Sequence, residues 1–143
     1  MSTIAEMIGT ELVGKSGNIS SQETLENKVV GIYFSAHWCG PCRQFTPMLV
    51  EFYNNFKAMG APMEIIFVSA DQNQEEFNKY YETMPWVAMP FGDSKNDLLN
   101  DHFKIEGIPT LVFVDPANNK VLTTDGRSLL TGGENQLLDW CFN

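Results

Sequence analysis

Two cysteines separated by two residues are the clearest chemical feature of this sequence. Cys39 and Cys42 lie in the stretch HWCGPCR, residues 37–43. Such a pair can bind a metal ion, form a structural disulfide, or exchange electrons through a reversible disulfide. These uses need different ligands and different neighbouring elements, so the rest of the sequence must decide between them.

The remaining cysteines and histidines do not favour a metal site or a structural disulfide. A structural zinc ion needs four ligands, usually from a second cysteine pair or a histidine pair. Beyond the first pair the chain offers only Cys141, His37 and His102, so no metal is expected. A metal cluster shared between two chains stays an alternative. Three cysteines are also an odd number, unlike the disulfide framework of a small secreted protein.

The composition is that of an acidic globular protein. With 143 residues, of which 43% are hydrophobic, the chain can bury a core without a disulfide or a metal. Nine basic against 18 acidic residues give a net charge of −9, which repels nucleic-acid phosphates and anionic lipid. No stretch approaches the roughly 20 apolar residues of a membrane span, and no targeting segment is readable at the start. We therefore expect a cytoplasmic protein, with nuclear entry as an alternative, that binds neither nucleic acid nor membrane.

The cysteine pair lies between a predicted strand and a predicted helix. Residues 28–36 form a nearly continuous apolar run, typical of a strand buried on both faces of an α/β sheet. From Pro41 to about Met59, apolar residues recur at the three- and four-residue spacing of an amphipathic helix, namely Phe45, Leu49, Phe52 and Phe56. Pro41 suits the first helical turn, where its missing N–H costs nothing.

This position predicts different roles for the two thiols. Unpaired N–H groups and the helix dipole favour a thiolate, and the pKa of the first cysteine in such motifs falls from about 8.5 to about 7 or below. Cys39 is therefore expected to be the nucleophile. Cys42, one turn further and more buried, is expected to attack the mixed disulfide and release the reduced client. Arg43 either adds positive charge near the pair or is an ordinary solvent-facing residue.

The other elements are expected to complete one domain, residues 1–143. An N-terminal strand and short helix should occupy residues 1–27. No internal repeat or linker is visible. Further strands are expected at 65–70, 111–114 and 121–124, helices at 74–83, 96–103 and 134–141, and a hairpin turn at 115–119.

The cysteine motif, followed later by Gly107-Ile108-Pro109-Thr110 before an apolar strand, resembles the thioredoxin family over almost the whole chain. The resemblance implies an α/β thioredoxin fold, with a central mixed β-sheet flanked by helices. It implies a cis Pro109 that faces the two sulfurs, and an Ile108 backbone that pairs with a bound substrate. Trp38, Gly40 and Pro41 are expected to contact the substrate as well, since an aromatic ring beside a thiol offers apolar contact area.

Further stretches resemble the tryparedoxin and nucleoredoxin branch of this family. These are MPWVAMPF at 84–91, together with residues 33–36, 69–71 and 123–127. In addition, the 38 residues from 71 to 108 are roughly twice what a plain thioredoxin has between the third core strand and the cis-proline, so an enlarged segment is expected. Two positions differ from the tryparedoxin pattern: Gly40 replaces the usual proline, and Ala70 replaces a tryptophan.

Three polar residues match positions that line the active-site side in this branch: Tyr33, Asp71 and Arg127. Tyr33 occupies the site of the buried aspartate of ordinary thioredoxin. Asp71 is expected either to replace that aspartate near Cys42 or to cap the next helix, with Asn73 as a competitor. Arg127 either contacts substrate or forms a surface ion pair.

Three other residues have simpler interpretations beside functional ones. His37 either modulates charge near neutral pH or is a solvent-facing loop residue. Trp86 is expected in the core. Cys141 is expected to be a packing thiol, with regulatory oxidation or dimer linkage as the alternative.

The resemblance implies a monomeric protein-disulfide reductase that cycles between the Cys39/Cys42 dithiol and a redox disulfide. No cofactor is expected to be bound, because electrons come from an external reductant, either NADPH through a reductase or a low-molecular-weight dithiol. Its clients would be disulfide-bearing proteins such as peroxiredoxins. With a Gly-Pro spacer, the potential should lie nearer the roughly −270 mV of thioredoxin than the roughly −120 mV of a dedicated oxidant. The alternative is a nucleoredoxin-like module whose binding to partners is gated by the redox state of the pair.

Overall fold

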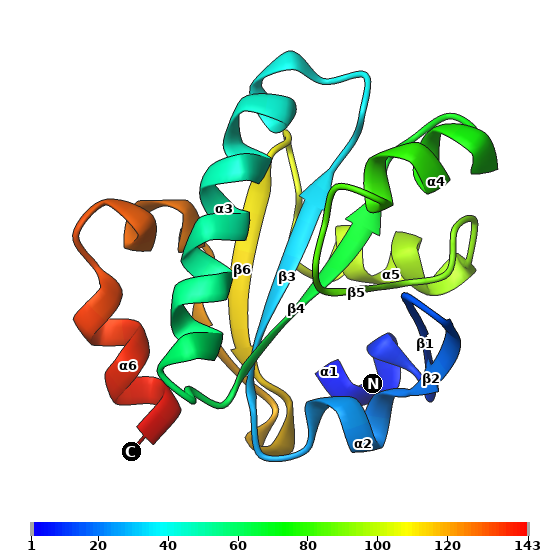
Figure 1. Cartoon of the computed structure of the whole chain (residues 1–143). Helices are drawn as coiled ribbons and strands as arrows, with labels where there is room; N and C mark the ends of the chain where they lie inside the picture. The colour runs from blue at the N-terminus through cyan, green and yellow to red at the C-terminus, as the bar shows by residue number, and fades with distance from the viewer. Residues whose placement is uncertain (1, 143) are drawn as a thin grey trace.

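A seven-stranded mixed sheet forms the centre of the computed structural model, which describes residues 2–142 (Figure 1). The strand order is β2-β1-β5-β4-β3-β6-β7, with β3, β4 and β5 parallel and the other neighbours antiparallel. The strands are β1 (Glu11–Gly14), β2 (Gly17–Ser20), β3 (Val29–Ser35), β4 (Met63–Ser69), β5 (Val87–Ala88), β6 (Thr110–Asp115) and β7 (Lys120–Thr123). The expected mixed sheet of the thioredoxin fold is thereby confirmed.

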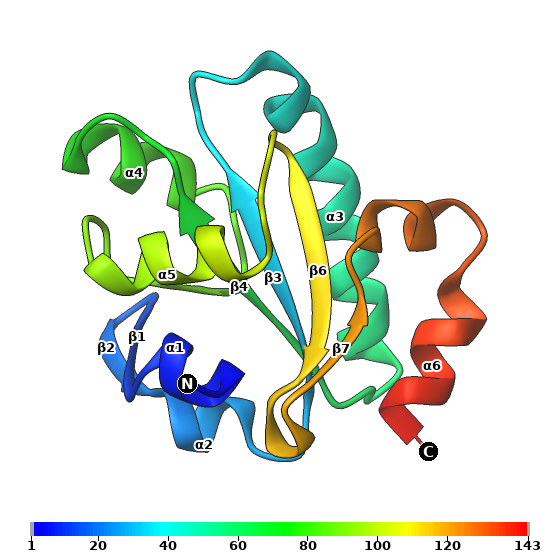
Figure 2. The ribbon, with the colours of Figure 1, turned by 180° about the vertical axis from the view of Figure 1, so that it is seen from behind.

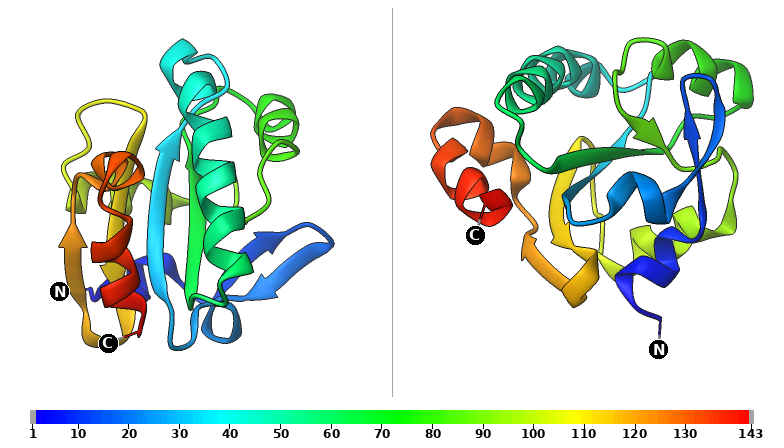
Figure 3. Two further views of the ribbon diagram at one scale, coloured as in Figure 1. Left: turned by 60° about the vertical axis from the view of Figure 1, so that its left-hand side comes forward. Right: turned by 60° about the horizontal axis from the view of Figure 1, so that its bottom comes forward.

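Helices cover both faces of this sheet. They are α1 (Ile4–Ile8), α2 (Ser21–Leu25), α3 (Gly40–Ala58), α4 (Gln74–Tyr81), α5 (Ser94–His102) and α6 (Glu134–Phe142), with short 3₁₀ turns η1 (Pro116–Asn118) and η2 (Gly126–Thr131). Helices α3 and α6 lie on one face, and α1 and α5 lie on the other (Figures 2 and 3). Within residues 2–142, no helix has the length and apolar character needed to cross a membrane.

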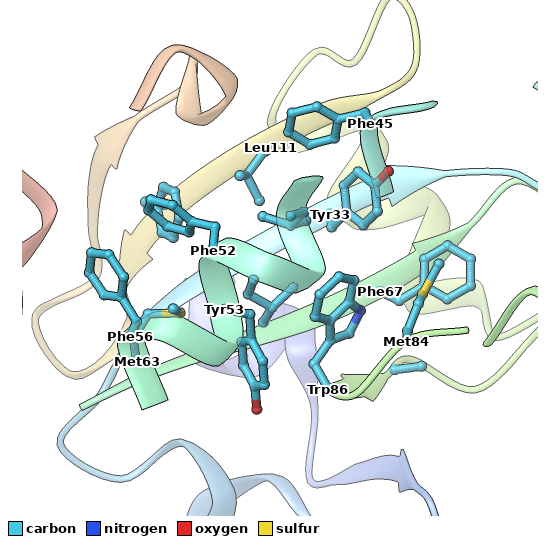
Figure 4. Close-up of a cluster of buried hydrophobic side chains, with 14 of the residues drawn as sticks. Tyr33, Phe45, Phe52, Tyr53, Phe56, Met63, Phe67, Met84, Trp86 and Leu111 are labelled. Atoms are coloured by element: carbon cyan, nitrogen blue, oxygen red, sulfur yellow. The ribbon is translucent and has the colours of Figure 1, made fainter. Parts of the chain in front are cut away.

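Two hydrophobic cores, one on each face, hold these layers together. The core beneath α3 is rich in aromatic side chains, among them Tyr33, Phe52, Tyr53, Phe67 and Trp86 (Figure 4). The core on the α1 and α5 face is mainly aliphatic. Every residue of β3 is buried, because its side chains alternate between the two cores. The sequence prediction of a strand buried on both faces is confirmed.

Most predicted elements are present, with bounds that differ by a few residues. The prediction for the N-terminal region is wrong in detail. Residues 4–25 form helix α1, the hairpin β1–β2 and helix α2 rather than one strand and one helix. Helix α1 begins with a capping box in which Thr3 and Glu6 bond each other's backbone N–H groups. Met1 and Asn143, the two ends of the expected domain, lie outside the described residues.

The enlarged segment between β4 and Pro109 is confirmed, and it widens the sheet. It contains α4, β5 and α5. The two-residue strand β5 pairs with β4 on one side and, through Ala88 and Val13, with the N-terminal hairpin on the other. The sequence did not reveal β5, since two residues carry no periodicity. Trp86, next to this strand, is 1% exposed and belongs to the core, as predicted.

Candidate active site

Cys39 lies at the junction between β3 and α3, where the sequence places it. It is the N-cap residue of α3, and its Sγ accepts a hydrogen bond from the backbone N–H of Cys42 at 3.3 Å. Its thiol faces the carbonyl oxygen of Ile108, with 3.8 Å between sulfur and oxygen. A sulfur that receives a helical N–H is held where negative charge on it is favoured.

Cys42 lies one turn further along α3 and has no exposed surface. Burial, together with a hydrogen bond to Cys39, raises its pKa to about 11. Hydrogen bonds from the Ser35 side chain and the Ala36 backbone oppose this rise in the pKa. Cys42 therefore keeps its proton at neutral pH in the reduced protein, as expected of a resolving cysteine.

The Ile108–Pro109 peptide bond is cis, which confirms the expectation for this proline. Pro109 is buried, and the half-buried Ile108 packs against a small cluster formed by Ala36 and the two cysteines. The chain segment that leads into β6 therefore closes the site from the side opposite the helix. The pairing of Ile108 with a substrate backbone stays a prediction.

Trp38 covers the outer edge of the site. Its side chain is 52% exposed, yet its Nε1–H donates to the carbonyl oxygen of Ala70 at 2.9 Å. The indole is thus held in place while it presents apolar surface beside Cys39. Gly40 and Pro41 form the first helical turn, and Pro41 is exposed. Substrate contact by these three residues stays a prediction.

Asp71 is bound to the loop before Trp38. Its carboxylate accepts hydrogen bonds from the His37 backbone N–H at 2.7 Å and from the Ser69 hydroxyl at 2.6 Å. None of its hydrogen bonds within residues 2–142 involves Cys42. The capping of α4 is carried out by Asn73, whose side chain accepts the Glu76 N–H. Asp71 therefore positions the active-site loop, and its role in catalysis stays a prediction.

Tyr33 lies directly beneath the first turns of α3. Its hydroxyl forms a 2.7 Å hydrogen bond with the Thr46 hydroxyl and approaches the Cys42 carbonyl oxygen at 3.5 Å. The residue is fully buried, and this burial raises the pKa of the phenol well above its ordinary value. Tyr33 thus replaces a charged group with a neutral hydroxyl at this position.

Arg127 reaches the site from η2. Its Nη1 donates to the carbonyl oxygen of Pro109 at 3.2 Å, and its guanidinium lies 5.4 Å from the ring centre of Phe45. It lines two surface hollows of about 460 and 470 Å³, one along the cis-proline segment and one along Pro41 and the start of α3. The structure therefore gives Arg127 a position between two surfaces that a client segment can contact.

Sequence reasoning missed three hydroxyl groups of the site. Ser35, Thr46 and Tyr80 are buried and hydrogen-bonded to one another, with oxygen–oxygen distances of 2.7 Å from Ser35 to Tyr80 and 2.6 Å from Tyr80 to Thr46. Thr46 carried a usable signal, since it lies four residues after Cys42 on the same helix face. Tyr80 comes from α4, and nothing local in the sequence places it here.

Two features outside the pair bear on the remaining interpretations. Cys141 is half-buried against the aromatic core, and burial raises its pKa to about 11, as for a packing thiol. Within residues 2–142, no group of three or more histidine, cysteine, aspartate or glutamate side chains is arranged to hold a metal ion.

A dithiol at a strand-to-helix junction, facing a cis-proline within a mixed sheet, defines a redox site of the thioredoxin type. Residues 27–121 match the thioredoxin-like family model. The chain belongs to this family, in its tryparedoxin and nucleoredoxin branch. The family assignment supports oxidoreductase activity in general.

Individual relatives agree with this assignment. Mouse nucleoredoxin is 46% identical over 123 residues, which cover 85% of this chain and 28% of that protein. The chain thus spans less than a third of this relative's length. Tryparedoxin I from Crithidia fasciculata superposes with a TM-score of 0.86 at 35% identity, covering 99% of this chain and 100% of the other. Tryparedoxin II complexed with glutathionylspermidine gives a TM-score of 0.86 at 32% identity, covering 98% and 99%.

Proposed function

We propose that this chain reduces disulfide bonds of client proteins through a cycle between the Cys39/Cys42 dithiol and their disulfide. The observation that carries the proposal is the asymmetry of the pair. Cys39 Sγ receives the Cys42 N–H at the start of α3, while Cys42 is buried with its pKa raised to about 11.

Each turn of the cycle moves two electrons. Cys39 attacks one sulfur of the client disulfide, so a mixed disulfide forms and the first client thiol leaves. Cys42 then attacks the Cys39 sulfur, and its proton is passed to the second client thiol as that thiol departs. The client disulfide has become two thiols, and the chain holds the Cys39–Cys42 disulfide. An upstream reductant returns it to the dithiol.

Two classes of reductant fit this cycle: NADPH through a reductase, or a low-molecular-weight dithiol. Similarity to a tryparedoxin complexed with glutathionylspermidine supports a thiol reductant of low molecular weight. Peroxiredoxin-type peroxidases are proposed as clients on the basis of family resemblance. The cytoplasm is the proposed location, since its glutathione and thioredoxin systems maintain reduced thiols.

Reduction of insulin disulfides tests the proposed function. The purified chain is supplied in parallel with NADPH plus thioredoxin reductase, glutathione plus its reductase, and trypanothione plus its reductase. Turnover with at least one donor, lost in Cys39→Ser, is the expected result. The donor that sustains it identifies the class of reductant. Absence of turnover with all three, in protein whose pair still cycles with dithiothreitol, contradicts the proposal.

A second candidate function is redox-gated protein binding, without turnover. It is favoured by Trp38, whose half-exposed indole offers a fixed apolar contact next to the reactive thiol. Such a partner would bind the reduced chain and the Cys42→Ser variant with one affinity and the oxidised chain with another. No disulfide of the partner would be reduced.

A further inference from the structure

Four buried hydroxyl groups form a continuous hydrogen-bonded chain beneath Cys42. Ser35 at the end of β3 lies 2.7 Å from Tyr80 of α4, oxygen to oxygen, and Tyr80 lies 2.6 Å from Thr46 of α3. Tyr33 joins at Thr46, 2.7 Å away. All four residues are at most 3% exposed. Three separate elements thus bring their hydroxyls to one place under the resolving thiol.

The end of this chain fixes the direction of its hydrogen bonds in the reduced protein. Thr46 donates to the carbonyl oxygen of Cys42 at 3.0 Å, which uses its single hydrogen. Tyr80 must then donate to Thr46, and Ser35 must donate to Tyr80, because each hydroxyl has one hydrogen. The Ser35 oxygen is left to accept the Cys42 S–H. In this direction the chain stabilises the protonated thiol.

The opposite direction stabilises the thiolate. When Cys42 loses its proton, the Ser35 O–H can turn toward the sulfur, and the Tyr80 O–H can turn toward Ser35. Thr46 must turn as well and donate to Tyr80, because otherwise no hydrogen would lie between these two oxygens. The Cys42 carbonyl oxygen then keeps the Tyr33 hydroxyl, 3.5 Å away, as a donor. Three hydroxyl rotations suffice, and no heavy atom has to move. Donors in series polarise one another, so the bond to the sulfur is stronger than one from an isolated serine. A hydrogen bond from Ser35 does lower the pKa of Cys42, against the effect of burial.

We propose that the Ser35–Tyr80–Thr46 hydroxyl chain stabilises the Cys42 thiolate during resolution by reversing its hydrogen bonds, in place of a charged proton acceptor. Ser35 is the hydroxyl of this chain that hydrogen-bonds the Cys42 side chain. Tyr80 acts through Ser35 as a positioning residue. The inference rests on the cycle proposed above, in which Cys42 attacks the mixed disulfide. The thiol proton leaves with the departing client thiol or to solvent, so the hydroxyls themselves gain and lose none.

The other titratable groups around Cys42 do not supply a nearer acceptor. Both tyrosines of the cluster have raised pKa values because they are buried, so they remain neutral. The His37 ring packs edge-on against Tyr80 with 5.7 Å between ring centres, and the Asp71 carboxylate is bound to the His37 backbone and Ser69. The titratable groups that face Cys42 are Cys39 at the start of its helix, Tyr33 from β3 and Tyr80 from α4. His37, in the adjoining loop, contacts Tyr80.

Stopped-flow reaction with an aromatic disulfide whose released thiol is coloured separates the two chemical steps. The first release reports attack by Cys39 and depends on reagent concentration. The second reports attack by Cys42 on the Cys39 mixed disulfide and does not. Cys141→Ala is the parent, so that only the active-site pair reacts. The variants are Ser35→Ala and Tyr80→Phe.

The matched control is Tyr81→Phe. Tyr81 is the next residue of α4, and its hydroxyl donates to the Trp86 carbonyl oxygen at 2.6 Å and lies 3.1 Å from the Val13 carbonyl oxygen. All three variants thus remove one buried hydroxyl, but only two of these hydroxyls belong to the chain beneath Cys42.

The second phase should slow about tenfold in Ser35→Ala and about threefold in Tyr80→Phe, with its pH profile shifted to higher pH. The first phase should be unchanged in both, and Tyr81→Phe should match the parent in both phases. Second phases of Ser35→Ala and Tyr80→Phe equal to that of Tyr81→Phe overturn the proposed role of the hydroxyls. The assay uses no protein client. Failure to reduce insulin, with the slowed second phase present, would therefore count against the proposed function alone.

Discussion

The two active-site cysteines are three residues apart on the chain and lie in very different surroundings. Cys39 keeps a small exposed fraction, 7%, next to the half-exposed Trp38, and its sulfur faces a helical N–H and the Ile108 carbonyl. Cys42 has no exposed surface and lies over a buried group of neutral hydroxyls. One helical turn thus separates a thiol that can meet a client from a thiol that can react only with its neighbour. Both residues are cysteines, so their positions in the fold determine which thiol a client can reach and which thiol keeps its proton.

The largest expected effect comes from removing either sulfur. Cys39→Ser and Cys42→Ser should both abolish multiple-turnover reduction of insulin, but for different reasons. Cys39→Ser should form no adduct with a client disulfide. Cys42→Ser should form the mixed disulfide through Cys39 and accumulate it, because the resolving thiol is missing. Non-reducing electrophoresis and intact mass spectrometry distinguish the two.

Cys141→Ser is the matched control for these variants and should retain full turnover. Cys141 lies on α6 and packs against the aromatic core, away from the pair. Accumulation of the mixed disulfide in Cys39→Ser instead of Cys42→Ser would reverse the assigned roles.

The pH dependence of the two steps should differ. Burial raises the pKa of Cys42 to about 11 in the dithiol, and the neighbouring Cys39 thiol contributes to this rise. In the mixed disulfide Cys39 carries neither proton nor charge, so the pKa of Cys42 should fall below that value while burial still keeps it high. The thiolate fraction therefore grows with pH, and the resolution rate should rise up to about tenfold per pH unit above neutrality.

Stopped-flow measurement of the concentration-independent phase between pH 6.5 and 9.5, about three pH units, checks this expectation. The parent for the measurement is the Cys141→Ala protein. A resolution rate that is flat over this range would mean that Cys42 is already ionised in the mixed disulfide, and that burial does not control its proton.

A smaller effect is expected at Arg127, which belongs to the Cys39 side of the comparison. Arg127→Ala removes the donor to the Pro109 carbonyl and the contact with Phe45. Because the side chain is largely exposed, solvent screens its charge. Attack on an acidic peptide disulfide should slow about threefold, with resolution by Cys42 unchanged.

Arg127→Lys separates charge from geometry, since lysine keeps the charge but not the planar fork. Partial recovery with lysine supports a role in holding the cis-proline segment as well as in attracting the client. If Arg127→Ala slowed only the resolution by Cys42, Arg127 would act on the Cys42 step and not on the attack by Cys39.

The difference between the two sides also explains which parts of the site could be predicted from sequence. The surroundings of Cys39 are local: a buried strand, a helix start and the residues between them, all readable from spacing and composition. Pro109 was found through family resemblance, because a sequence indicates only a turn-forming X-Pro bond. The surroundings of Cys42 depend on side chains from β3, α3 and α4. The partners of the Tyr80 hydroxyl are Ser35 and Thr46, which belong to other elements, so the sequence around Tyr80 does not indicate its position.

The fold follows the same rule. Long elements with clear periodicity, such as β3 and α3, were predicted within one or two residues of their ends. The two-residue strand β5 and the hairpin β1–β2 were not. Strand β5 is defined by its pairing with β4 and, through Ala88 and Val13, with β1, and the hairpin is defined by four pairs between its two short strands. Short strands of this kind are set by tertiary contacts and leave almost no local pattern.

The smallest effect is expected at Asp71, where the sequence favoured two opposing roles. Asp71→Asn keeps an oxygen that can accept the His37 N–H but removes the charge. If the carboxylate only positions the loop, resolution by Cys42 should keep its rate and pH profile, and the free energy of unfolding should fall by about 1 kcal/mol or less. Stopped-flow kinetics and urea unfolding measure both quantities in the same protein.

Asp71→Ala, which also removes the acceptor, should cost more stability because the His37 N–H loses its partner, about 1–3 kcal/mol. It should still leave the pH profile of resolution in place. A tenfold slower resolution in Asp71→Asn would instead make this carboxylate the proton acceptor for Cys42. The neutral hydroxyls would then not be sufficient to stabilise the Cys42 thiolate. The carboxylate that positions the loop before Cys39 would also act on Cys42.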